Sequence, residues 1–192
     1  MNPQLQSYHD RFAEARDAMR DLAAELAEDI AAKSPATDAW SVVQIIEHMC
    51  VVGGLLLPRI DVGIEEAIVR NLRSDGPFKY PPMSRIFIRA VSPLTHEKQS
   101  RMRVPRIYRP EERRTLAEAS ARFIVLQEDF MERCENADGL DIARVALGSP
   151  VTPMIRLRLG AWFESLATHQ ERHFGQIERA LAALGVEMAE VS

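Results

Sequence analysis

Two histidines stand four residues apart in the stretch THQERHFGQIERAL, residues 168–181. Apolar residues around them recur at steps of three and four over residues 162–184, a spacing that predicts an amphipathic helix. His169 and His173 occupy consecutive positions of its apolar stripe. Because side chains at i and i+4 lie above one another on a helix, about 5–6 Å apart at Cβ, these two imidazoles can converge on one ion.

An earlier helical pattern offers a third imidazole. Its stripe consists of Trp40, Gln44, His48, Val51 and Leu55. Burying a polar ring without a hydrogen bond costs about 1–3 kcal/mol, whereas a whole domain is stable by only roughly 5–15 kcal/mol. A cation shared by His48, His169 and His173 would remove that cost. Gln44 and Gln176, one turn from the histidines, are candidate hydrogen-bond partners for the remaining ring nitrogens.

The competing interpretation is that these are ordinary histidines without a metal. Two histidines at i and i+4 are a weak motif by themselves, and surface or hydrogen-bonded core histidines are commoner. The position of His48 on a second apolar stripe favours a three-histidine site. Such a site leaves a divalent ion with its full charge and an open coordination position, so the ion is a Lewis acid. It could acidify a water for hydrolysis or hold a substrate thiol as the thiolate.

No general base or nucleophile is identified by the sequence, so the catalytic residues stay unassigned. Glu47 and Glu164 fall off the histidine stripes, and Glu47 is expected to be a solvated or interhelical charge. Cys50 lies roughly opposite His48 on its helix and is expected to be a small buried hydrophobe.

Four long helical patterns would position these residues. They cover residues 3–33, 40–73, 111–134 and a last stretch that begins between 154 and 160 and ends near 185, with almost no β signal. Gly53, Gly54 and Pro58 lie inside the second pattern and predict a bend or a change of register there. We therefore expect an all-α four-helix bundle in one domain over residues 1–192.

A long connection over residues 74–110 separates the second and third patterns, and residues 146–153 are expected to be irregular. The connection holds a short helical pattern around residues 83–91. Seven basic residues lie between positions 98 and 114: Lys98, Arg101, Arg103, Arg106, Arg109, Arg113 and Arg114. A solvated surface is the simpler interpretation of this segment. The alternative is that part of it borders the site and binds carboxylates of an anionic cofactor or substrate.

The overall composition is that of an average soluble globular protein. With 24 Lys and Arg against 28 Asp and Glu, the net charge of -4 favours neither nucleic acid nor an anionic membrane as a partner. The two cysteines, Cys50 and Cys134, have no paired spacing, which fits a reducing compartment. No leader peptide and no run of about 18 apolar residues is visible. A cytoplasmic protein is expected.

Two stretches together resemble the paired signature of the DinB/YfiT-like superfamily. WSVVQIIEHM, residues 40–49, carries a tryptophan followed eight residues later by a histidine, and HQERHFGQIERAL, residues 169–181, carries the second pair of histidines before Gln-Ile. The resemblance implies an up-down-down-up four-helix bundle, often a homodimer. It also implies a divalent metal on His48, His169 and His173, with zinc or nickel as the leading candidates and iron or manganese as alternatives.

The same resemblance implies a range of activities. Some members transfer low-molecular-weight thiols such as bacillithiol, mycothiol or glutathione, and others resemble metal-dependent hydrolases or isomerases. The expected function is therefore a metal-dependent enzyme acting on a small molecule, as a thiol S-transferase with a low-molecular-weight thiol cosubstrate or as a hydrolase. The alternative is a non-catalytic metal-binding helical bundle with a structural or stress-related role. An open coordination position beside a cavity would favour the enzyme.

Overall fold

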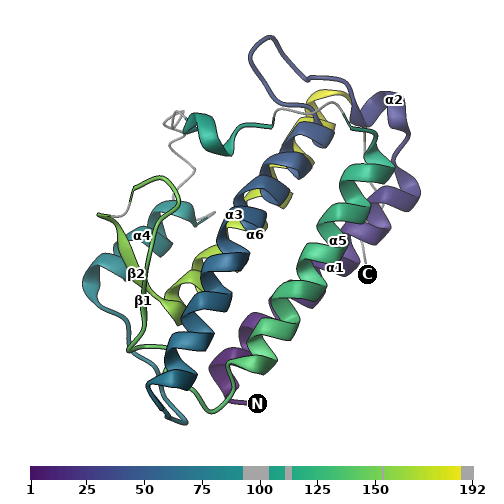
Figure 1. Cartoon of the computed structure of the whole chain (residues 1–192). Helices are drawn as coiled ribbons and strands as arrows, with labels where there is room; N and C mark the ends of the chain where they lie inside the picture. Colours follow the sequence, from purple (N-terminus) through teal and green to yellow (C-terminus); the bar gives the residue numbers. More distant parts are fainter. Residues whose placement is uncertain (93–103, 111–113, 153, 187–192) are drawn as a thin grey trace.

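The computed structural model describes residues 1–92, 104–110, 114–152 and 154–186, and it is mostly helical (Figure 1). The four long helices are α1 Pro3–Glu25, α3 Val42–Val69, α5 Leu116–Asn136 and α6 Leu159–Ala183. Helix α1 packs against α5 and α6, and α3 packs against the same two helices. The prediction of a helical fold is confirmed.

Side chains that accept hydrogen bonds from the backbone define the start of two long helices. The Ser41 hydroxyl accepts from the Gln44 backbone N–H, and the Gln44 side chain accepts from the Ser41 N–H. Thr115 and Glu118 form the same reciprocal pair before α5. Each pair satisfies backbone N–H groups that have no partner within the helix. The first pair places His48 in the second turn of α3.

The first helical pattern, predicted as one helix over residues 3–33, is divided in two. Helix α1 ends at Glu25, the backbone becomes extended at Leu26, and the short α2 covers Glu28–Ala31. The break brings the Glu28 carboxylate to the start of α5, where it accepts from the Leu116 backbone N–H at 2.8 and 3.0 Å. This long-range contact has no signature in the local spacing of apolar residues.

Helix α3 continues as one α-helix through Gly53, Gly54 and Pro58. A Cβ added at Gly53 would overlap the Leu126 side chain of α5. Glycine at this position therefore permits the close approach of α3 and α5. Helix α3 is long and apolar enough to cross a membrane by length and composition alone, and 61% of its most apolar window is buried inside the protein. Such burial is the pattern of a core helix.

The first strand of a β-hairpin lies in the segment 146–153 that was expected to be irregular, so that prediction is wrong for residues 146–148. Strands β1 Ala146–Gly148 and β2 Arg156–Arg158 pair antiparallel, with Leu147 opposite Leu157. Both leucines are buried, and the Trp162 indole N–H donates to the Leu147 carbonyl at 3.2 Å. The strands are too short for alternation of apolar and polar residues to reveal them.

The short helix expected within the long connection is confirmed as α4 Pro82–Val91, which packs against α6. The segment before it is fixed by Tyr80, whose hydroxyl is hydrogen-bonded to the Tyr8 hydroxyl at 3.1 Å. A Cβ at Gly160 would overlap the Tyr80 hydroxyl, so glycine allows the start of α6 to pack against this ring. Phe87 of α4 then contacts Trp162 of α6 edge to face, with ring centroids 5.5 Å apart.

Candidate metal centre

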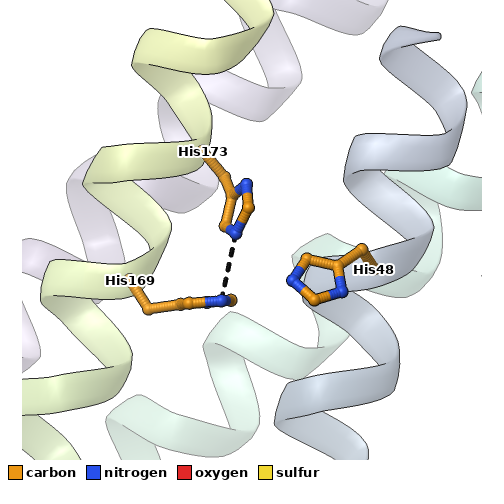
Figure 2. Close-up of side chains that lie close together, drawn as sticks. All are labelled: His48, His169 and His173. Carbon is orange, nitrogen blue, oxygen red and sulfur yellow. Dashed lines mark hydrogen bonds between the residues drawn. The ribbon is translucent and has the colours of Figure 1, made fainter. Parts of the chain in front are cut away.

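Three imidazole rings meet between α3 and α6 (Figure 2). His48 comes from α3, and His169 and His173 come from successive turns of α6. One ring nitrogen of each residue lies within 4.8 Å of the others. The ring centroid of His48 is 5.2 Å from that of His169 and 4.7 Å from that of His173. The two helices therefore bring all three histidines picked from the sequence to one point, where they could hold a divalent metal ion.

Hydrogen bonds at the Nδ1 atoms orient two of the rings. His48 Nδ1 donates to the Tyr108 backbone carbonyl at 2.6 Å, and His173 Nδ1 donates to Gln176 Oε1 at 2.8 Å. An imidazole whose Nδ1 carries the proton keeps the lone pair on Nε2. Both rings therefore present an Nε2 lone pair, as metal-binding histidines do when an acceptor holds the opposite nitrogen.

The spacing of the two Nε2 atoms on α6 fits a shared cation. His169 Nε2 lies 3.0 Å from His173 Nε2, and the two atoms are joined by the dashed line in Figure 2. Without a cation, one of these nitrogens must donate a proton to the other, because two lone pairs at that distance repel. An ion about 2.0–2.1 Å from each nitrogen holds a pair of ligands roughly 3 Å apart. The donor set and its spacing thus suit a divalent ion.

Burial keeps all three imidazoles neutral near pH 7. Desolvation lowers the pKa of His48 and lowers that of His173 to about 3. The pKa of His169 is well below its usual value because of burial and of repulsion from the charged forms of the other two rings. A metal ligand must be the neutral imidazole, so these shifts leave the nitrogens available without loss of a proton.

The three histidines line a cavity of about 280 Å³. Its body is apolar and is lined by side chains of α3, α4, α6, the hairpin and residues 104–108, among them Leu56, Phe87, Val104, Ile155, Trp162 and Leu166. Arg172 lines the same cavity beside the histidines. The volume lies near the lower end of the range for small-molecule sites, which are usually apolar with a few polar groups.

A family model described as the DinB superfamily matches residues 11–177. The chain belongs to the DinB superfamily. Comparison with curated proteins and with solved structures gave no match. The matched range contains His48, His169 and His173, so the resemblance drawn from the two short stretches is confirmed at the level of the family.

The partner expected for His173 is confirmed, and the one expected for His48 is wrong. Gln176 accepts from His173, as its place on the same stripe predicts. Gln44 instead accepts a hydrogen bond from the Ser41 N–H at the start of α3, and the Tyr108 carbonyl is the acceptor for His48. Tyr108 lies 60 residues away in sequence, in the 3-10 turn η2 Arg106–Tyr108. Every residue has a backbone carbonyl, so this acceptor could not be identified from residue types.

Within the described residues, the basic segment borders the cavity through residues other than arginine. Val104, Pro105 and Tyr108 line it, whereas Arg106 and Arg109 are exposed. Arg114 pairs with Glu47, its Nε lying 3.3 Å from Glu47 Oε2. Lys98, Arg101, Arg103 and Arg113 lie outside the described residues. Among the described residues, Arg172 is the cation that lines the cavity, and it was not singled out from the sequence.

The two off-stripe residues of α3 lie where helical geometry predicted. Glu47 is an interhelical charge, as one of the two alternatives held, and it is buried rather than solvated. Its Oε2 is also 3.3 Å from the Arg122 guanidinium of α5. Cys50 is a buried residue, and burial raises the pKa of its thiol to about 12. A thiol with such a pKa is protonated at neutral pH and is a poor nucleophile.

Replacing Gln176 by alanine is expected to weaken metal binding by about 10–100-fold, because the acceptor that holds the His173 ring would be lost. Gln176→Glu keeps an acceptor oxygen and should retain most of the affinity. Competition titrations against a chromophoric chelator at fixed pH would measure both variants. Equal affinities for wild type and Gln176→Ala would show that this hydrogen bond does not orient the ring.

Metal-free protein is expected to lose stability as the pH falls from 7.5 to 5.5. Unfolded histidines bind a proton near pH 6.5, whereas folded His173 does so only near pH 3. The unfolded state therefore binds more protons in this window, and the free energy of unfolding falls by up to about 1.4 kcal/mol per pH unit for each such histidine. Urea unfolding with a chelator present would measure the slope. His173→Gln should flatten it, and an unchanged slope would contradict the assignment.

Proposed function

We propose that this DinB protein is a metal-dependent enzyme that acts on a small molecule, either as a thiol S-transferase or as a hydrolase. His48, His169 and His173 would hold the divalent ion. The observation that supports an enzyme is that the three imidazoles open onto a cavity large enough for a small substrate. His169 is only partly buried, so the cluster is reachable from that cavity. Structural metal sites are usually closed by four protein ligands.

Zinc or nickel is the proposed metal, with iron or manganese as alternatives. Three neutral imidazole nitrogens suit zinc, nickel and iron better than magnesium or calcium, which prefer oxygen ligands. A bound ion would supply a Lewis acid for an attacking water or thiol. The protein's own residues would fix the ring orientations through Tyr108 and Gln176 and would exclude bulk water with the apolar walls of the cavity.

A second candidate is a non-catalytic role in which the metal stabilises the fold. The positions of the ligands on two helices favour this role, because an ion bound to His48 and His173 would cross-link α3 and α6. The hydrogen bond from His48 would also tie in the turn at Tyr108. This role predicts a large rise in melting temperature with metal and no turnover in any assay.

We further infer a cytoplasmic homodimer built on an up-down-down-up four-helix bundle. The family and the pairwise packing of the four long helices support the bundle. Exposed apolar side chains near the end of α3, namely Val62, Ile68 and Val69, offer surface for a second copy. Light scattering coupled to size exclusion would report a mass near twice 21.7 kDa. A mass of one chain at micromolar concentration would contradict the dimer.

The proposed activity can be tested on untagged protein purified without chelators. The metal-loaded protein would be incubated with bacillithiol, mycothiol or glutathione and a panel of apolar electrophiles, and separately with ester and amide substrates. Product is expected with the metal-loaded wild type and is expected to be lost in His48→Ala. Full metal content with no turnover in either panel would favour the structural role, and absence of metal would contradict the site.

A further inference from the structure

Arg172 is a cation beside the histidine cluster that the proposed chemistry does not use. It lies on α6 between His169 and His173, and its half-buried side chain lines the cavity. It directly precedes His173 in the chain, and repulsion from its charge contributes to the lowered pKa values of all three histidines. Arg172 thus lines the same cavity as the three histidines that would hold the ion.

The guanidinium of Arg172 has no carboxylate partner within the described part of the chain. Other partly buried arginines do: Arg11 pairs with Glu171 at 2.6 Å, and Arg133 pairs with Asp61 at 2.9 Å. Burial lowers the pKa of Arg172, and the nearby charge of Arg179 lowers it further. Arginine nevertheless stays charged at neutral pH. A partly desolvated charge without a partner is costly, and a ligand anion would offset that cost.

The rest of the cavity selects an apolar ligand body. Leu56, Phe87, Ile155, Trp162 and Leu166 form walls of apolar side chains. Three hydroxyl groups also line the cavity, but that of Ser165 donates to the Trp162 carbonyl, and those of Tyr108 and Ser149 are hydrogen-bonded to each other. The Trp162 indole N–H is already engaged by the Leu147 carbonyl. A volume of about 280 Å³ admits a compact ring or a short aliphatic chain. The ligand is therefore apolar at one end and anionic at the other.

We propose that Arg172 binds the carboxylate of a small apolar acid. This contact places the carboxylate end of the acid, where the reaction would occur, beside the three histidines. A carboxylate is favoured over a phosphate, because one planar guanidinium matches two carboxylate oxygens, whereas a phosphate usually recruits further donors. This substrate class rests on the proposed function. It makes Arg172 a specificity-determining residue rather than a metal ligand.

Binding of 3-phenylpropionate and of its uncharged amide to wild type, Arg172→Gln and Arg179→Gln would test the proposal by calorimetry. Wild type is expected to prefer the acid over the amide by about 10–100-fold. Arg172→Gln is expected to lose that preference. Arg179→Gln, which removes the same charge from an exposed position outside the cavity lining, should keep it. Circular dichroism and metal content would verify that the variants fold.

Each titration would be run on metal-loaded and on chelator-treated protein, which separates this proposal from the proposed function. A preference for the acid that disappears in Arg172→Gln under both conditions supports the role of Arg172, whatever the metal does. A preference that survives in Arg172→Gln but needs the metal means that the ion itself binds the carboxylate, which overturns the proposal. Failure of wild type to distinguish acid from amide also overturns it. Glutathione serves as a polar acid and is titrated into the chelator-treated protein, where its thiol has no ion to bind. Binding there that is tighter than that of 3-phenylpropionate would contradict the apolar class.

Discussion

Replacing His173 by alanine is expected to abolish stoichiometric metal binding. The change removes one of three nitrogens and leaves His48 and His169, which cannot by themselves hold an ion against a chelator. The loss should exceed the roughly 10–100-fold that follows removal of an outer hydrogen bond to a metal ligand. Among the described residues no further histidine, cysteine or carboxylate joins the cluster, so no neighbouring side chain replaces the His173 nitrogen. Elemental analysis after dialysis would measure the effect.

His9→Ala is the matched control for this variant. His9 lies on α1, with Nδ1 3.3 Å from the Asp10 carboxylate and Nε2 3.7 Å from that of Glu135, so it is not part of the cluster. It should retain one metal per chain. Equal metal content in His173→Ala and wild type would contradict the site, and so would loss of metal from His9→Ala.

The second large effect is expected for Trp162→Ala, which should destabilise the protein by about 3–5 kcal/mol, the usual cost of removing a buried aromatic side chain. Trp162 is 2% exposed, contacts Phe87 of α4 and donates to the Leu147 carbonyl of the hairpin. The variant would therefore loosen two elements that line the cavity. For a chain of this length the melting temperature should fall by roughly 6–20 °C, as calorimetry would record.

Trp162→Phe separates packing from hydrogen bonding, because it keeps most of the apolar ring and loses the N–H donor. An intermediate loss of stability is expected. Both variants should still bind metal at 20 °C, since Trp162 contributes no ligand atom. A stability of Trp162→Ala within 1 kcal/mol of wild type, as urea unfolding would measure, would show that the hairpin and α4 pack independently of this side chain.

Helical periodicity made the histidine cluster predictable. His169 and His173 follow the local i, i+4 geometry of α6, and Gln176 follows one turn later, so their mutual positions depend only on the helix. His48 required the further assumption that apolar stripes of two helices face each other. That assumption holds, because α3 and α6 pack directly together. The pattern of apolar residues therefore predicts the part of the site that depends on the packing of neighbouring helices.

The remaining features depend on contacts between segments distant in sequence. Tyr108 reaches His48 through a backbone carbonyl, which no residue type announces. In the sequence, Arg172 is an ordinary polar residue of an amphipathic helix. Its place at the cavity depends on α4, the hairpin and residues 104–108, which enclose the space beside it. The first helical pattern breaks at Leu26, and the Glu28 carboxylate beyond the break contacts the start of α5. Local propensity contains none of this information.

Diffraction from metal-loaded crystals at the absorption edge of the bound metal would test the three-histidine site most directly. We expect one anomalous peak between α3 and α6, about 2.0–2.1 Å from the Nε2 atoms of His48, His169 and His173. A peak beside other residues would contradict this site, as would loaded protein in which one of these rings turns away from the ion.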